Sequence, residues 1–553
     1  MHVDMHIVRS KFTSAAGKTY QTVLLRESYR EGNKVKKRTI ANLTRCSPEE
    51  IAAIELALQY KHNLTDLGSI NDIQTKEGLS IGSAWTIYSI ANQLGIVNAL
   101  GSEREGQLAL WQIIARVLEQ GSRLSAVRLG ETYALASTIG LENGFCEDDL
   151  YKNLCWLTRH QEQIETQLFQ TRFHATPPQL FLYDVTSSYL EGDKNELADW
   201  GYNRDKKNGK KQIVIGLMCT EDGVPVTTEV FKGNTQDPAT LSDQINKIKD
   251  RFGCTNITFV GDRGMIKSGQ IEALAEEGYH YITALTKKQI ETLIHKKIVD
   301  YSLFDKNICE ASCDGIRYIF RKNPLRAQEI AQNRFSKKSS IEKLIADRNN
   351  YLAAHPKAME NTALAMVNKK IQKLGMSGLL SVQAENKKLN LMVDETAWEE
   401  AAKFDGCYVL KTDLPSSVAD KQTIHDRYKD LAFVESAFKT VKSDLDIRPI
   451  YVRTEESTRG HVFIVMLAYM IMKKLDQMWS SLYFTVEEGL RSLSTLCINE
   501  VSANGKMFQQ IPQPRLQNQK LLQAAGVQLP KVLPKNSARV VTRVSRRKSA
   551  LPV

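Results

Sequence analysis

The chain has 553 residues, of which 42% are hydrophobic, and its formal net charge is +11, a length that suits roughly three or four domains. The positive charge favours a polyanionic partner, nucleic acid or an anionic membrane surface, although a basic soluble protein without such a partner has the same composition. No apolar run approaches the ~20 residues that cross a bilayer, the first residues lack a signal-peptide core, and the nine scattered cysteines fit reduced thiols, so we expect an intracellular protein outside the membrane.

The first part of the chain is predicted to form a basic β-hairpin followed by a helix. Strand-like alternation turns at a Glu-Gly-Asn sequence and continues into a run that carries Lys36, Lys37 and Arg38. Such a hairpin can hold DNA phosphates, but a solvated edge strand protected by lysines has the same appearance. Ser47 and Pro48 then stand where a helix cap and a first helical residue are expected.

Helical periodicity later gives way to strands. The segment from about residue 80 to 175 has few helix breakers, and the following segments alternate between apolar strands and helices. Two of the strands form a hairpin that turns near Asp222, and a helix begins with Asp237 as its cap. A further strand, helix and strand follow, so this part is predicted to be a mixed α/β layer.

The α/β pattern is interrupted and then resumes. The interrupting segment contains long charged helices and two strand pairs, and it is followed by a strand, an amphipathic helix and a strongly apolar helix that we expect in the core. We therefore divide the chain into a basic N-terminal module expected to bind DNA (1–75), a helical region (76–175), the first part of the α/β core (176–290), an insertion domain (291–402), the second part of the core (403–475), and a C-terminal helical region with a basic tail (476–553).

Three acids occupy positions from which they could form one site. Asp184 follows the apolar segment FLY, and Asp262 follows the segment ITFVG. Burying an unpaired carboxylate is costly, so Asp184 needs a partner. On the amphipathic helix, Tyr428, Glu435 and Lys442 are spaced by seven residues, which keeps them within about 40° of one helix face.

A divalent-metal site is one interpretation of these acids. Mg²⁺ prefers oxygen ligands, and a cluster of carboxylates keeps its negative charge only when a cation neutralises it. The alternative is three unrelated acids, each capping a turn or paired with an arginine, such as Arg263 beside Asp262. The spacing leaves both interpretations open.

The same segments resemble insertion-sequence transposases of the DDE type, in the insertion-sequence-four-like superfamily. DVTSSYLEG carries Asp184, VGDRGMI carries Asp262, and YKDLAFVESAFKTVK carries Glu435. The last segment is similar to the family signature Tyr-x2-Arg-x3-Glu-x6-Lys, with Tyr428 in register and Leu431 at the Arg position. The basic hairpin, ESYREGNKVKKRTIANL, is similar to the start of the family's proteins.

The resemblance implies a ribonuclease-H-like core interrupted by an insertion domain, and a cytoplasmic, nucleoid-associated prokaryotic protein. It implies that Asp184, Asp262 and Glu435 are catalytic and bind two Mg²⁺ ions, which Mn²⁺ could replace. The activity would be cleavage of double-stranded DNA at the terminal inverted repeats and transfer of the 3′-hydroxyl ends to target DNA by a homodimer, with a hairpin intermediate in relatives. The residues expected to contact DNA are Tyr428, Lys442, Arg263, Lys36, Lys37, Arg38 and His461.

Other functions stay open at this point. A nuclease on the same core would cut DNA without joining it, and a transposase-derived protein could bind DNA after losing its chemistry. Trp398 in the insertion could stack on an extruded base, although packing is the simpler role. An RNA-binding module is disfavoured because the aromatic strand pattern of the commonest such fold is missing.

Overall fold

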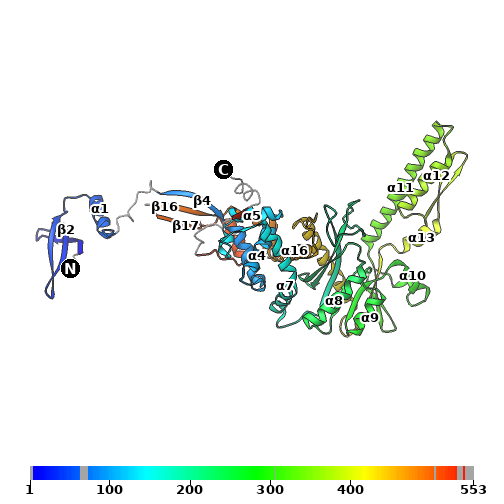
Figure 1. Ribbon diagram of the computed structural model, residues 1–553, viewed down its shortest axis with the longest axis horizontal. Helices are drawn as coiled ribbons and strands as arrows, with labels where there is room; N and C mark the ends of the chain where they lie inside the picture. The colour runs from blue at the N-terminus through cyan, green and yellow to red at the C-terminus, as the bar shows by residue number, and fades with distance from the viewer. Residues whose placement is uncertain (1–3, 63–72, 306, 504–505, 532–539, 542–553) are drawn as a thin grey trace, which may run out of the picture.

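The computed structural model describes residues 4–62, 73–305, 307–503, 506–531 and 540–541. Figure 1 shows an elongated molecule, with the N-terminal sheet at one end and a projecting helical hairpin, α11 and α12, at the other. Within the described residues, no helix combines the length and the apolar character that a membrane span requires. Apart from residues 540–541, the basic C-terminal tail lies outside the described residues.

The N-terminal module is an antiparallel sheet with one helix. The predicted cap is confirmed, because the Ser47 hydroxyl accepts a bond from Glu50 N and the Glu50 carboxylate accepts one from Ser47 N. A small core of Val23, Leu43 and Ile51 holds the helix to the sheet. The elements are β1 (Asp4–Thr13), β2 (Thr19–Glu31), β3 (Lys34–Asn42) and α1 (Pro48–Gln59).

A helical region follows, and a small sheet joins it to the C-terminal part of the chain. In that sheet β16 pairs antiparallel with both β4 and β17. Its strands are β4 (Gln74–Ser80), β16 (Cys497–Ala503) and β17 (Lys506–Gln510). The helices are α2 (Gly82–Gln93), α3 (Ile96–Leu100), α4 (Arg104–Leu118), α5 (Arg123–Thr132), α6 (Leu135–Thr138) and α7 (Glu147–Phe173), and the short strand β5 (Phe145–Cys146) pairs with β18 (Val540–Val541).

The central sheet has the order β11-β12-β15-β10-β9-β6-β7-β8. Strands β6, β9 and β10 are parallel, whereas β7 and β8 run antiparallel beside β6. This arrangement of three antiparallel strands followed by two parallel ones confirms the expected ribonuclease-H-like mixed α/β core. The elements are β6 (Leu180–Tyr189), β7 (Gln212–Thr220), β8 (Pro225–Lys232), α8 (Asp237–Phe252), β9 (Thr258–Gly261), α9 (Ser268–Glu276) and β10 (His280–Ala284).

The start of α8 corrects one expectation. The helix has Gln236 as its N-cap, without a side-chain cap bond, and Asp237 is its first residue. The Asp237 carboxylate instead accepts two hydrogen bonds of 2.7 Å from Arg204. The side chain that the sequence pattern predicted to cap the helix therefore forms a charge-assisted pair with an arginine.

The segment between β10 and β15 has two parts. Its first strands extend the central sheet, while its helical hairpin and second strand pair form a separate core that includes Ile341, Val367 and Leu389. The division into domains stays a prediction. The elements are α10 (Lys287–His295), the 3₁₀ turn η3 (Tyr301–Leu303), β11 (Cys309–Cys313), β12 (Ile316–Lys322), α11 (Pro324–Ala354), α12 (Glu360–Lys373), β13 (Leu380–Glu385), β14 (Lys388–Val393), α13 (Glu395–Lys403) and β15 (Cys407–Thr412).

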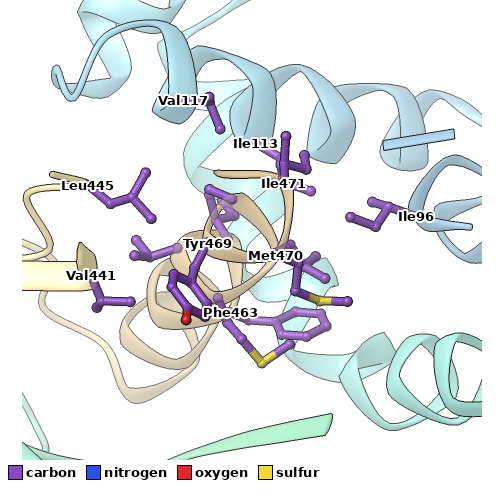
Figure 2. Close-up of a cluster of buried hydrophobic side chains, with 14 of the residues drawn as sticks. Ile96, Ile113, Val117, Val441, Leu445, Phe463, Tyr469, Met470 and Ile471 are labelled. Atoms are coloured by element: carbon purple, nitrogen blue, oxygen red, sulfur yellow. The ribbon is translucent and has the colours of Figure 1, made fainter. Parts of the chain in front are cut away.

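The largest core surrounds one helix. The expected core helix is confirmed, since α16 buries side chains on all sides. Figure 2 shows Phe463, Tyr469 and Ile471 of this helix in one buried cluster with Ile113, Val441 and Leu445. A helix that is apolar all round must be covered all round. The last elements are α14 (Lys421–Lys429), α15 (Leu431–Ser443), α16 (Glu455–Trp479), the 3₁₀ turn η4 (Ser480–Leu482), α17 (Val486–Ser494) and α18 (Leu516–Ala524).

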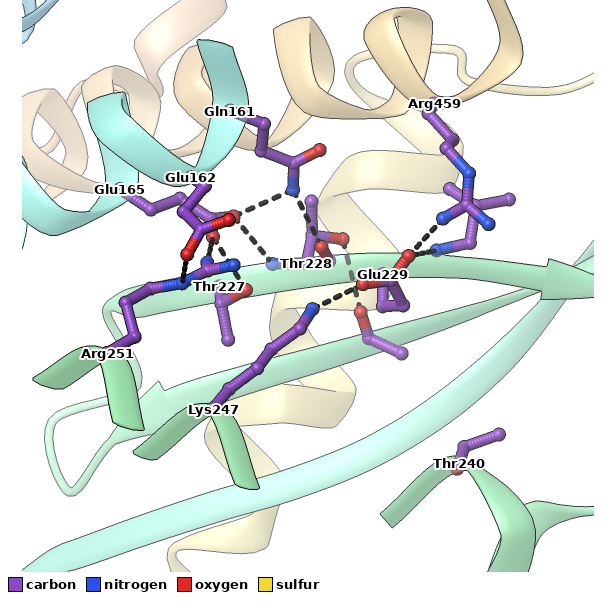
Figure 3. A network of polar contacts seen from close by, with 12 residues as sticks. Gln161, Glu162, Glu165, Thr227, Thr228, Glu229, Thr240, Lys247, Arg251 and Arg459 are labelled. Carbon is purple, nitrogen blue, oxygen red and sulfur yellow. Dashed lines mark hydrogen bonds and ion pairs between the residues drawn. The ribbon is translucent and has the colours of Figure 1, made fainter. Parts of the chain in front are cut away.

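A polar network ties the helical region to the sheet (Figure 3). The Glu165 carboxylate of α7 accepts hydrogen bonds from Gln161 Nε2 (2.8 Å), Thr227 Oγ1 (2.9 Å), Thr228 N (3.2 Å) and Arg251 Nη1 (2.6 Å). Burial raises the pKa of Glu165. A buried carboxylate is tolerated only when its oxygens are satisfied, so these contacts fix α7, β8 and α8 to one another.

Candidate active site

Asp184 lies on β6, the central strand of the ribonuclease-H-like core. Successive side chains of a strand point to opposite faces of the sheet, so Phe181 and Tyr183 pack in the core formed with α8 and α9, while Leu182 packs in the core formed with α15 and α16. Asp184 therefore faces α15. Its side chain is partly buried.

Asp262 directly follows β9, the parallel neighbour of β6. Tyr183 pairs with Gly261 in this ladder, so the residues that come next lie at the same level of the sheet: Asp184 in the middle of β6 and Asp262 just past the end of β9. Asp262 is exposed, and its Oδ1 accepts hydrogen bonds from Arg263 N (2.7 Å) and, at a longer 3.4 Å, from Tyr428 Oη.

Glu435 reaches the same place from α15. Its helical neighbours Val434 and Phe438 are buried against the sheet, and Glu435 itself is exposed at the edge of that stripe. A pocket of about 600 Å³ is lined by five of the residues expected from the sequence and by several others. The five are Asp184, Asp262, Arg263, Tyr428 and Glu435.

The pocket holds carboxylates and cations together, since Arg263, Lys287 and Lys429 line it beside the three acids. Burial raises the pKa of Asp184 to about 7, the carboxylates of Asp262 and Glu435 add to this rise, and the Val185 N–H and the Arg204 guanidinium oppose it. Burial, with a further contribution from Asp262, also raises the pKa of Tyr428. Within the described residues, no three His, Cys, Asp or Glu side chains are close enough to form a metal site as they stand.

The expected helix that carries Tyr428, Glu435 and Lys442 is two helices. It breaks at Asp430, between α14 and α15, although Tyr428 and Glu435 still line one pocket. Lys442 lies farther along α15 and does not line that pocket; its Nζ is 2.8 Å from Oδ1 of Asp205. Its phosphate contact stays a prediction.

The other residues expected to contact DNA lie away from the pocket. His461 is 8% exposed, its Nδ1 is 3.1 Å from Nη2 of Arg123, and burial followed by the Arg123 charge lowers its pKa well below the usual value. It is therefore a neutral core residue that faces the helical region. Lys36, Lys37 and Arg38 lie on β3 of the N-terminal module, where Arg38 bonds to Glu27.

Two further predicted positions can be located. Leu431, at the family's arginine position, is buried and lines the pocket, as does the neighbouring Lys429. Arg427 points elsewhere, with its Nη1 2.6 Å from Glu221 Oε2. Trp398 is partly buried against the core of the helical hairpin, and its ring centroid lies 5.7 Å from that of Phe335. These are the contacts expected of a packing residue.

His425 and Arg204 were not predicted from the sequence. His425 lines the pocket, and its Nε2 contacts Arg321 Nη1 (2.7 Å) and Tyr408 Oη. It stands three residues before Tyr428, so helical spacing could have suggested a shared face. Arg204 comes from a loop, and no spacing rule connects it to its partner Asp237.

Comparisons with known proteins bear on this arrangement. The family described as "Transposase DDE domain" matches residues 175–471, and the family described as "IS1634 family transposase, N-terminal domain" matches residues 7–67. A cryo-EM structure of the piggyBac transposase synaptic complex with hairpin DNA is similar at 9% identity and a TM-score of 0.36, over 74% of this chain and 75% of that one. Curated proteins give no significant match. Because the DDE-domain match spans more than half of its length, the chain belongs to the DDE family of insertion-sequence transposases.

Proposed function

We propose that this transposase binds the terminal inverted repeats of its insertion sequence, cuts DNA at the element ends, and transfers the freed 3′-hydroxyl ends to target DNA. The observation that carries the proposal is the meeting of Asp184, Asp262 and Glu435 in one pocket of a DDE-family chain. They come from a central strand, its parallel neighbour and the helix that covers them.

The donor chemistry of the pocket fits divalent metal, whose use the DDE family generally implies. We propose that Asp184, Asp262 and Glu435 hold two Mg²⁺ ions. Their oxygens are the ligands that Mg²⁺ takes, and a bound cation would offset the burial and the two neighbouring carboxylates that raise the pKa of Asp184. When bound, the ions would supply Lewis-acid activation of the attacking water or 3′-hydroxyl and stabilise the leaving oxygen.

The surrounding side chains would hold the DNA. Arg263, Lys429 and Lys287 line the pocket, so their cations can neutralise phosphates on either side of the scissile bond. Tyr428 keeps its phenol protonated, because its pKa is raised, and can donate to Asp262 or to a phosphate oxygen. His461 is not among these side chains, since it is buried away from the pocket.

The N-terminal module would add affinity for DNA that does not depend on the base sequence. Lys36 and Lys37 on β3 are exposed, and such side chains set affinity and register on the DNA backbone. Assembly of two copies on paired ends, with double-stranded DNA as the partner, completes the proposed cut-and-paste reaction.

A cleavage assay tests this proposal. Labelled DNA that carries the element's own ends, found as imperfect inverted repeats beside the coding region, is incubated with Mg²⁺ or EDTA. We expect the wild type to cut at the repeat boundary only with metal, and Glu435→Gln to lose at least about a thousandfold in rate, since a metal ligand is removed. Glu272→Gln, an exposed acid on α9, is the matched control and should cut normally.

Each contrary result has a clear meaning. Normal cleavage by Glu435→Gln would remove Glu435 from the site. Cutting without joining, in a strand-transfer assay with target DNA, would make the protein a nuclease. End binding without any cutting by the wild type would make it a DNA-binding protein that has lost its chemistry.

A further inference from the structure

A basic loop of residues 200–211 leads into β7, and its base is closed. Asp199 N donates to Gln212 O (3.1 Å), and Gln212 N donates to Asp199 O (3.0 Å). Gly201 packs so tightly that a Cβ there would lie 2.0 Å from the carbonyl oxygen of Gly233. A loop pinned at its base and packed against the sheet is an ordered element with a surface of its own.

This 200–211 loop is anchored beside the carboxylate pocket. Arg204 N donates to Ser187 Oγ (3.0 Å) on β6, and the Arg204 guanidinium makes its two bonds to Asp237. Asp237 Oδ2 is 3.8 Å from where a Cβ of Gly264 would lie, so it adjoins the turn that begins at Asp262. Both contacts lie on the α8 face of the sheet, so the loop meets the carboxyl ends of β6 and β9 next to the turn that begins at Asp262.

A second anchor ties the loop to α15, the helix that carries Glu435. The Asp205 side chain is 2% exposed, and its carboxylate accepts from Tyr189 N (3.2 Å) and pairs with Lys442 (2.8 Å) and Arg448. A buried carboxylate with two cations and a backbone donor has one well-defined geometry. Lys442 is thus a positioning residue of the loop in this structure.

Between these anchors the loop presents aromatic rings and cations to solvent. Trp200 is 59% exposed and Tyr202 is 81% exposed. The Arg204 guanidinium lies over the Tyr202 ring, 5.6 Å from its centroid, and Lys207 lies 5.7 Å from the centroid of Tyr189. Aromatic rings held in water by a fixed scaffold lose little entropy when they bind a ligand. Proteins commonly bind unpaired nucleotides with such rings interleaved with cations.

We propose that the 200–211 loop binds an unpaired stretch of the DNA substrate next to the carboxylate pocket, with Trp200 and Tyr202 stacking on bases and Lys206 and Lys207 neutralising phosphates. The inference rests on the proposed function, because the pocket that the loop borders is the proposed cleavage site. Bases inside a duplex present only their edges, so the ligand class is single-stranded DNA.

The test uses the full chain, EDTA to prevent cleavage, and a short single strand of random sequence that contains 2-aminopurine, whose fluorescence falls on stacking. We expect wild type to quench the probe. The double variant Trp200→Ala, Tyr202→Ala should bind about 5- to 150-fold more weakly for each base that no longer stacks, and should not quench at saturation. The pair Trp200→Phe, Tyr202→Phe should retain both properties, because the ring faces remain.

Two further variants separate stacking from charge and from exposure alone. Lys206→Gln with Lys207→Gln should keep the quenching and lower the slope of log K against log salt by about 0.7 for each phosphate that is no longer neutralised. Tyr483→Asn is the control, since Tyr483 is 96% exposed and has a φ of 58°, which Asn tolerates. It should behave as wild type.

Cleavage of element-end DNA with Mg²⁺, measured on the same proteins, separates the two proposals. Quenching that depends on Trp200 and Tyr202 supports the loop proposal even when the wild type cuts nothing, a result that overturns only the proposed function. Equal quenching and affinity in the wild type and the alanine pair overturn the loop proposal, whatever the cleavage result. Should the alanine pair fail to fold, an unchanged salt slope in the lysine pair overturns it.

Discussion

At the scale of single residues, the Glu165–Arg251 ion pair shows what a buried charge requires. The Glu165 side chain is 0% exposed and that of Arg251 is 13% exposed. Removing one partner of such a pair leaves an uncompensated charge, which costs about 3–5 kcal/mol. We expect Arg251→Met to lower the free energy of unfolding by about that amount in urea titrations. Lys249→Met, which removes a surface pair with Glu277, should leave it nearly unchanged.

The cost of Arg251→Met should also depend on pH. Burial raises the pKa of Glu165 above its usual 4.5, and removing the Arg251 charge raises it further. An acid whose pKa is higher in the folded state than in the unfolded state binds protons preferentially in the folded state. The free energy that it costs the fold is therefore absent below the unfolded-state pKa and grows as pH rises. The deficit relative to wild type should be smaller at about pH 5 than at about pH 8. Equal deficits at both would assign the effect to poorer packing.

Residue type predicted part of the site and left the rest hidden. Asp184 and Asp262 could be found because each follows an apolar segment of strand character, where a carboxylate is unexpected and needs a reason. Helical spacing placed Lys442 on α15 but could not predict its partner, since Asp205 comes from a loop far away in the chain. Arg204 was missed for the same reason. Partners joined only by tertiary contact carry no local pattern.

At the scale of elements, α16 and α7 approach so closely that only glycine fits between them. A Cβ on Gly460 would lie 2.1 Å from the carbonyl oxygen of Leu154 on α7. Backbone cannot yield as a flexible side chain can, so we expect Gly460→Ala to destabilise the fold by about 1–3 kcal/mol. Gly269→Ala on α9 meets nothing within 4 Å and should be neutral or stabilising. Thermal melts of the two variants make the comparison, and equal melting temperatures would contradict it.

Elements were predictable where one periodicity ran unbroken. β7 is buried along its whole length, and its continuous apolar run indicated a central strand. The helix around Tyr428 and Glu435 was predicted as one because heptad spacing continues across Asp430, where the structure changes from α14 to α15. The spacing of residues shows which positions share a helix face. It cannot show a break in the helix when the residues on both sides of the break still share that face.

At the scale of the whole molecule, segments far apart in the chain are joined in one body. β4, near the start, pairs with β16, near the end, and α16 packs against both the helical region and the sheet. The order of the α/β elements predicted the ribonuclease-H-like core. The β4–β16 pairing was not predicted, because such short strands have many equivalent partners in sequence.

The N-terminal module, by contrast, has its own small core, so its contribution to DNA binding can be separated from the chemistry. The exposed side chains of Lys36 and Lys37 would each displace counterions on contact with duplex phosphates. We expect Lys36→Gln with Lys37→Gln to weaken end binding and to lower the slope of log K against log salt by about 0.9 for each phosphate that is no longer neutralised. Cleavage at saturating protein should continue, because these residues lie on β3, away from the carboxylate pocket. Lys520→Gln, an exposed lysine on α18, is the control, and an unchanged slope in the double variant would mean that β3 is a solvated edge strand.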